Sequence, residues 1–284
     1  MELYLRYPGF KTKAVTLSYD DGSVSDRKMV TILNQHHIKC TFNLNSGLMD
    51  KASNIHKEEA PVLYDNSFYE IAVHTLNHPH LSNLGTAQIA YEILEDRKNL
   101  EDIFSHPIEG MAYPYGLDEI ESEIETIANC GIRYARTALA TRGFELPKDF
   151  LRLNPTCHHD DPELFQLLDR FLQPDDIAHP WRTRLKLFFL WGHSYEFDQK
   201  KSWDKLENIC CKIGGRGEIW YATNGEIIDY IDAYNHLRRN VNGNIIHNPS
   251  DCCLFAMVNG QNVILEPGKT IDVLCEIDQR NFLS

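Results

Sequence analysis

The sequence predicts an α/β protein built around a parallel β-sheet. Short apolar runs alternate with amphipathic segments of helix length over most of the chain. A strand followed by a helix recurs at least six times, which is the pattern of a parallel sheet joined by right-handed helical crossovers. The 284 residues, 43% of them hydrophobic, suffice for one large core, and α/β barrels commonly reach this length as a single unit.

The expected strands are apolar and β-branched runs of strand length. They cover residues 13–19, 38–44, 70–74, 109–113, 132–138, 151–156, 185–191 and 218–222. The expected helices carry apolar residues at helical spacing, and they cover residues 26–37, 86–104, 118–130, 162–172, 202–213 and 224–237. Thr86, Asp118 and Ser202 are typical residues for the start of a helix.

The sequence changes character near Asn240. Asn-Gly pairs at 242–243 and 259–260 and a Pro-Gly pair at 267–268 separate short β-prone runs. We therefore expect two units: a barrel over residues 1–238, and a small antiparallel β appendage over residues 239–284 that packs on it.

The acidic composition narrows the choice of partners. The formal net charge of −13 repels phosphate backbones and anionic membrane surfaces, so neither nucleic acid nor a membrane is expected as a partner. Neutral ligands such as sugars meet no such barrier. The sequence predicts no particular oligomeric state.

The cysteines and the N-terminus favour a cytoplasmic protein. The eight cysteines form no Cys-x-x-Cys unit, so we expect reduced and mostly buried thiols rather than a zinc ribbon or a redox motif. The opening MELYLRYPGF has no apolar core of signal-peptide length, and no later stretch approaches a membrane span. A secretion signal trimmed from this sequence remains the alternative.

Conspicuous polar residues follow several of the expected strands. In parallel barrels, the loops after the carboxyl ends of the strands carry the chemistry. Here those positions hold Asp20-Asp21-Gly22, HTLNHPH (74–80), YPYG (113–116), CHHDD (157–161) and WGHSYEFD (191–198). Because these segments share one polarity, we expect their side chains to converge at one end of the barrel.

Two of these segments indicate a metal site. His74 and His78 are close enough for both imidazoles to reach one ion, and a carboxylate from another strand end would complete a site of two histidines and one carboxylate. Asp20 and Asp21 alone are equally consistent with a solvated turn. With a metal present, one of the two can bind the ion while the other accepts a proton from water. His80 is better explained as a solvated loop residue.

His193 follows the apolar run LKLFFLWG and stands at the end of a strand that we expect to be buried on both faces. A histidine at this place can donate a proton to a leaving amine near neutral pH. The alternative is a core or capping histidine without a chemical role.

Together these segments resemble the polysaccharide deacetylase family, also called carbohydrate esterase family 4, whose catalytic unit is the NodB-type domain. The motifs occur in the family's order over roughly residues 12–235, as SYDDG (18–22), HTLNH (74–78), YPYG (113–116) and LWGH (190–193). The resemblance implies a distorted seven- or eight-stranded (β/α) barrel.

The resemblance also implies a role for each residue of the motifs. Asp20 would be the general base and His193 the general acid. Asp21, His74 and His78 would hold a divalent metal, most often Zn²⁺. The backbone N–H near Tyr115 would help to stabilise the oxyanion.

Two departures from the family pattern stand out. Ala112 occupies the place of an arginine that pairs with the catalytic aspartate, and Arg136 or Arg152 could substitute for it or be surface charges. The motif that orients the acid histidine has no clear match. His158, His159 or Asp160 of CHHDD lies in the corresponding region.

The expected activity is therefore metal-dependent removal of an acetyl group from an N-acetylated, less readily an O-acetylated, sugar or oligosaccharide. Tyr113, Pro114, Tyr115, Trp191 and Tyr195 are the expected contacts of the sugar or oxyanion, with packing at the barrel rim as the alternative for the aromatic residues. Two other functions remain open: a cyclic-imide or allantoin-type amidohydrolase on the same fold, and a non-catalytic carbohydrate-binding relative.

Overall fold

The computed structural model describes residues 2–64, 66–116, 121–175 and 183–275. Its central sheet has eight strands: β2 (Lys13–Asp20), β3 (Cys40–Leu44), β4 (Tyr69–Val73), β5 (Gly110–Ala112), β6 (Tyr134–Arg136), β7 (Cys157–His158), β8 (Lys186–His193) and β9 (Ile219–Tyr221). The strand order is β6-β5-β4-β3-β2-β8-β7, with β9 paired to the start of β2, and all pairs are parallel. The sheet curls into a distorted, open (β/α) barrel, which confirms the predicted fold class.

The central strand β2 determines where the acids lie. It pairs with β8 along its whole length, from Lys13 opposite Lys186 to Asp20 opposite His193. On its other side, Asp20 lies opposite Asn43 of β3. All eight residues of β2 are buried, as expected for a strand covered on both faces. The strand register therefore places Asp20 next to the strand end that carries His193.

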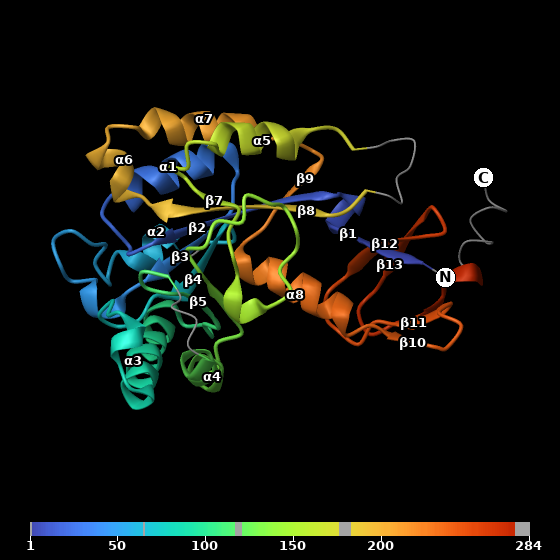
Figure 1. Cartoon of the computed structure of the whole chain (residues 1–284), viewed down its shortest axis with the longest axis horizontal. Coiled ribbons are helices and arrows are strands. Elements are labelled where there is room, and N and C mark those ends of the chain that lie inside the picture. The colour runs from blue at the N-terminus through green and yellow to red at the C-terminus, as the bar shows by residue number, and fades with distance from the viewer. Residues whose placement is uncertain (1, 65, 117–120, 176–182, 276–284) are drawn as a thin grey trace.

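Helices cover the sheet on both sides. They are α1 (Asp26–His36), α2 (Ala60–Tyr64), α3 (Thr86–Phe104), α4 (Glu121–Asn129), α5 (Leu164–Leu172), α6 (Tyr195–Gln199), α7 (Trp203–Ile213) and α8 (Asn224–Asn235). Figure 1 shows α1, α5, α6 and α7 along one side of the sheet and α3 and α4 on the opposite side. Leu17, Phe42, Phe188 and Leu206 belong to the large apolar core that these layers enclose. The predicted helices are thus present. Residues 118–120, the start of the helix predicted over 118–130, lie outside the described ranges.

One predicted strand is wrong. Residues 151–156 do not form a strand, because Asp149 accepts a hydrogen bond from the Leu151 N–H and starts a 3₁₀ turn over Phe150–Arg152. Leu153 then makes a single parallel bridge to Arg136 of β6, and the strand β7 begins only at Cys157 beside β8. This segment therefore contacts both outer strands of the sheet and partly closes the barrel.

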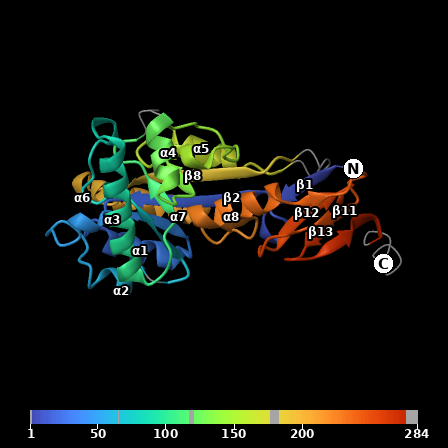
Figure 2. The same ribbon diagram turned by 90° about the horizontal axis from the view of Figure 1, so that it is seen from below.

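The strands that follow α8, together with the N-terminal strand, form two small antiparallel sheets (Figure 2). One has the order β1-β12-β13 and the other β10-β11-β14. Their strands are β1 (Leu3–Arg6), β10 (Arg238–Arg239), β11 (Ile245–His247), β12 (Leu254–Val258), β13 (Gln261–Leu265) and β14 (Thr270–Asp272). The N-terminal strand β1 pairs with β12, and the division of the chain into two units at residue 238 stays a prediction.

The remaining expectations on composition concern thiols and membranes. All eight cysteines are free; Cys40, Cys130, Cys157 and Cys210 are buried, so burial applies to half of them rather than to most. Within the described ranges, none of the helices combines the length and apolarity that a membrane crossing requires.

Candidate metal centre and active site

Side chains from the ends of three strands, β2, β4 and β8, meet at the carboxyl edge of the sheet. His74 and His78, which follow β4, each place Nε2 3.6 Å from Asp21 Oδ1. His193 at the end of β8 places Nε2 3.9 Å from carboxylate oxygens of both Asp20 and Asp21. The structure thus brings together the five residues that the sequence analysis assigns to base, acid and metal ligands.

Asp21, His74 and His78 have the geometry of a metal site. In a tetrahedral complex with bonds of about 2.1 Å, neighbouring ligand atoms lie about 3.4 Å apart, close to the 3.6 Å seen here. His74 Nδ1 lies 2.8 Å from the Ala112 carbonyl oxygen, and because a carbonyl only accepts, Nδ1 carries the proton. His74 Nε2 therefore has a free lone pair that faces the Asp21 carboxylate. These donors fit a zinc-like divalent ion.

Backbone strain is concentrated at this site. Asp21, Thr75, His78 and Tyr115 all have positive φ angles, between 56° and 76°, although none is a glycine. Such conformations cost on the order of 1–3 kcal/mol each and persist only where the surroundings hold them. One such support is Asn45, whose amide donates hydrogen bonds to the carbonyls of His74 and Thr75. The strained backbone at these positions therefore lowers the stability of the fold while it holds the candidate metal ligands in place.

Asp20 is 2% exposed and held from two sides. Its Oδ1 accepts a hydrogen bond from Asn43 Nδ2 at 2.8 Å, and its Oδ2 forms a buried ion pair with Arg136. Burial alone would raise the pKa of Asp20, but the Arg136 guanidinium, followed by His74 and His193, outweighs burial and lowers that pKa. Asp20 is therefore held as a carboxylate.

Arg136 thus supplies to Asp20 the guanidinium that the side chain of Ala112 cannot provide. It reaches Asp20 from the end of β6, and its guanidinium lies 4.4 Å from the ring centre of Trp191, a cation–π contact. Arg152, the other candidate, instead pairs with Asp149 at 2.6 Å in the 3₁₀ turn. Of the two arginines, only Arg136 is shown to contact the base.

His193 is oriented by a residue that the sequence analysis missed. Glu196 Oε2 lies 3.4 Å from His193 Nδ1, so that Nε2 faces the two aspartates. Burial lowers the pKa of His193, but Glu196, Asp20 and Asp21 outweigh it and raise that pKa above its ordinary value. The spacing of three residues between His193 and Glu196, at the start of a helix, was the available signal.

Glu196 also contacts the histidines of CHHDD. Its Oε2 lies 3.1 Å from Nε2 of both His158 and His159. Burial raises the pKa of Glu196, but the contacts with these two histidines and with His193 outweigh burial and hold that pKa far below its ordinary value. Asp160 instead pairs with the ammonium groups of two nearby lysines, Lys200 and Lys205. With two cations beside Asp160, this cluster fits hydrogen-bonded support for the acid histidine better than a second metal site.

The predicted aromatic contacts divide into exposed and buried ones. Tyr115 is 62% exposed, and its ring stacks on that of His80 with the ring centres 3.6 Å apart. Tyr113 is 2% exposed, and its hydroxyl donates a hydrogen bond to the Leu151 carbonyl oxygen. The prediction that Tyr113 flanks a sugar is therefore wrong, because its ring is part of the core. Pro114 is also buried. Trp191 is half-buried and packs on Arg136 rather than facing open solvent.

An open cleft adjoins the candidate metal ligands. Its volume is about 520 Å³, and its lining includes Asp21, His78, Tyr115 and Tyr195. Asn54, which donates a hydrogen bond to the Asp21 carbonyl, lies in the same wall. The exposed Tyr115 ring and the half-buried Tyr195 ring thus lie beside the ligand groups, where a ring-shaped substrate could contact both.

Comparison with known proteins agrees with this geometry. Residues 8–135 match the family model described as polysaccharide deacetylase, which confirms the resemblance predicted from the motifs. The matched segment contains Asp20, Asp21, His74 and His78 but not His193. Residues 8–135 are therefore similar to the polysaccharide deacetylase family, a family of hydrolases. No curated protein sequence matches the chain.

Solved structures support the fold. A putative polysaccharide deacetylase from Mycobacterium smegmatis aligns with 84% of this chain and 96% of its own, at 17% identity and a TM-score of 0.59. The Xyl-CE4 domain of a multidomain xylanase from the hindgut metagenome of Trinervitermes trinervoides aligns with 78% of this chain and 92% of its own, at 13% identity and a TM-score of 0.53.

A third structure, the Streptococcus pyogenes deacetylase PplD in complex with acetate, is 21% identical, with a TM-score of 0.45. The alignment covers 48% of this chain and 61% of PplD, so this chain spans less than two thirds of that relative.

Proposed function

We propose that the protein is a metal-dependent deacetylase of N-acetylated sugars or oligosaccharides. The observation that carries the proposal is the placement of a buried carboxylate, Asp20, and a histidine, His193, beside the metal-ligand set Asp21, His74 and His78. The family match supports deacetylation of sugars in general. The use of a metal and the identity of the sugar are parts of this proposal.

Different residues would serve the different steps of amide hydrolysis. A divalent ion bound by Asp21, His74 and His78 would lower the pKa of a water molecule and polarise the acetyl carbonyl. Asp20 accepts a proton from the water that attacks the carbonyl carbon. Arg136 and Asn43 hold both Asp20 oxygens in place, so the base is charged and oriented before substrate arrives.

The leaving group needs a proton as the C–N bond breaks. His193 Nε2 faces the site, and its raised pKa keeps the imidazole protonated toward neutral pH. Donation of that proton to the amine nitrogen releases a free amino sugar and acetate. Glu196 holds Nδ1 and thereby fixes which nitrogen donates.

The oxyanion needs donors as well. Among the described residues, no acceptor forms a hydrogen bond with the Tyr115 N–H, whose direction depends on the positive φ of this residue. This N–H is our candidate donor to the carbonyl oxygen. The exposed Tyr115 ring beside it is the candidate platform for the sugar.

The non-catalytic alternative loses its main support. It rested on the missing arginine, and Arg136 supplies a guanidinium to Asp20 from another strand. The chain also retains a candidate base, a candidate acid and a metal-ligand set close together, which favours a catalytic protein.

The test is acetate release from N-acetylglucosamine oligomers by the wild type, Asp20→Asn and His193→Ala. We expect both substitutions to lower turnover by at least about a hundredfold, because each removes a proton-transfer group. Acetate release that survives Asp20→Asn would refute the assignment of the base. Hydrolysis of a cyclic imide in place of N-acetyl groups would favour the amidohydrolase alternative.

A further inference from the structure

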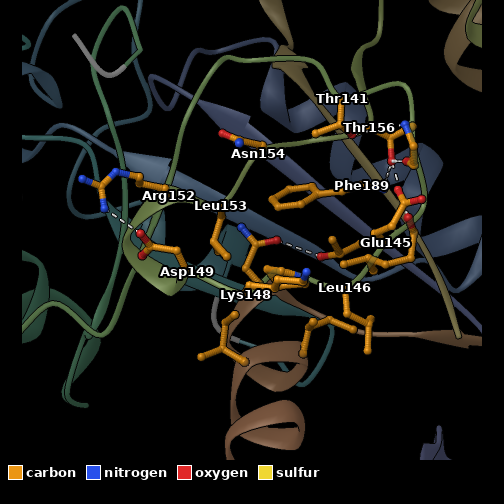
Figure 3. Close-up of a pocket in the computed structure, with 17 residues that line it drawn as sticks. Thr141, Glu145, Leu146, Lys148, Asp149, Arg152, Leu153, Asn154, Thr156 and Phe189 are labelled. Atoms are coloured by element: carbon orange, nitrogen blue, oxygen red, sulfur yellow. Dashed lines mark hydrogen bonds and ion pairs between the residues drawn. The ribbon is translucent and has the colours of Figure 1, made fainter. Parts of the chain in front are cut away.

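A second cavity is lined by residues of β2, β8, α8 and the segment before β7; Figure 3 shows the residues that line it. It has a volume of about 400 Å³, and its lining includes Thr16 of β2, Phe189 of β8 and Asn224 of α8. Thr16 precedes Asp20 by four residues on the same face of β2, which places it about 13 Å from the catalytic end. The lining includes none of the candidate metal ligands, so this is a separate site.

One buried polar atom in this cavity lacks a partner. Asn224 is 1% exposed, and its Oδ1 accepts a hydrogen bond from Thr16 Oγ1 at 2.9 Å. Its Nδ2 is buried and has no hydrogen-bond partner within the described part of the chain. Its backbone N–H donates to Thr41 Oγ1, which fixes the residue at the start of α8. An unsatisfied buried amide N–H costs about 1–3 kcal/mol, so an acceptor brought into the cavity would gain from meeting it.

The cavity walls are largely apolar and its rim carries an unpaired cation. Leu153, Leu187, Phe189, Ile227 and Ile228 form much of the apolar wall.

At the rim, Arg152 pairs with Asp149, and Glu145 accepts a hydrogen bond from the Phe144 N–H. Lys148 is exposed and has no ion pair among the described residues. Figure 3 shows the Lys148 side chain extending across the group of lining residues. Lys148 and the exposed Glu145 carboxylate are therefore the two rim charges without an ion pair among the described residues, and Lys148 is the one that can pair with an anion.

We propose that this cavity binds an amphipathic monocarboxylate with an aliphatic or aryl body. At about 30 Å³ for each heavy atom, the share of a water molecule in the liquid, the cavity holds on the order of thirteen non-hydrogen atoms. The apolar body packs against Phe189 and the isoleucines of α8. The carboxylate accepts from Asn224 Nδ2, and Lys148 attracts the negative charge. Binding here does not depend on the deacetylase proposal.

Decanoate is the direct probe, measured by isothermal titration calorimetry against the folded full chain. We expect saturable binding at one site, and binding at least about tenfold weaker for 1-decanol, which has the same chain without the charge. Acetate, which lacks the apolar body, should not bind here. Absence of saturable decanoate binding overturns the proposal, and equal binding of 1-decanol overturns its anionic part.

Two variants locate the site. Asn224→Leu removes the buried donor and Lys148→Met removes the rim cation; each should weaken decanoate binding about fivefold or more. Lys148 is exposed, so Lys148→Met should fold even if Asn224→Leu does not. Lys269→Met, an exposed lysine that does not line the cavity, is the matched control and should bind as the wild type. Lys148→Met binding that equals that of Lys269→Met overturns the assignment to this cavity.

Discussion

The buried ion pair between Arg136 and Asp20 makes a quantitative prediction. Arg136→Met removes the guanidinium but retains an apolar chain of similar length, and it leaves the Asp20 carboxylate 2% exposed and without its cation. An uncompensated buried charge of this kind costs about 3–5 kcal/mol of unfolding free energy. The lost contact with the Trp191 ring adds about 1 kcal/mol.

Arg152→Met is the matched control. Arg152 pairs with Asp149 near the surface, where an ion pair contributes about 0–1 kcal/mol. Urea unfolding, followed by circular dichroism, measures both variants. Adding Asp20→Asn to Arg136→Met should restore most of the lost stability, because the stranded charge is then gone. The account is refuted if Arg136→Met costs no more than Arg152→Met, or if the second substitution restores nothing.

Three further predictions concern the acid, a buried carboxyl and the aromatic rim. Glu196→Gln should lower kcat about tenfold to a hundredfold with bound metal retained, because only the orientation of His193 changes; unchanged kcat in acetate release would contradict this. Burial raises the pKa of Asp26 to about 7, so the folded protein keeps a proton that the unfolded chain loses near pH 4. The wild type should therefore lose up to about 4 kcal/mol relative to Asp26→Asn between pH 4 and pH 7, and parallel urea curves across that range would refute it. Tyr115→Ala should raise KM for oligomers about threefold or more, while Tyr113→Phe leaves KM unchanged; the reverse order would place the sugar elsewhere.

Much of the fold follows from local pattern. The strand that ends at Asp20 and the strand that ends at His193 are long and apolar, so their period and polarity are visible in the sequence. Parallel strands bring their carboxyl ends to one edge, which is why the positions of His74 and His78 relative to the acids could be expected. The site residues most accessible to prediction are therefore those directly after long strands.

Other features depend on long-range pairing that no local pattern reports. The first strand, Leu3–Arg6, pairs with a strand about 250 residues later, and nothing near it indicates that partner. Residues 151–156 are apolar enough for a strand, but the capping aspartate before them forms a tighter turn. Arg136 and Arg152 are alike in sequence, and only the curl of the sheet brings Arg136 to the base.

The central claim is that Asp21, His74 and His78 bind a divalent metal. The most direct measurement is metal content per chain, after exposure to Zn²⁺ and removal of excess, for the wild type, His78→Ala and the control His158→Ala. We predict about one Zn²⁺ for the wild type and for His158→Ala, and a large loss for His78→Ala. Zinc retained by His78→Ala but lost from His158→Ala would contradict the account and move the metal to the cluster around Glu196.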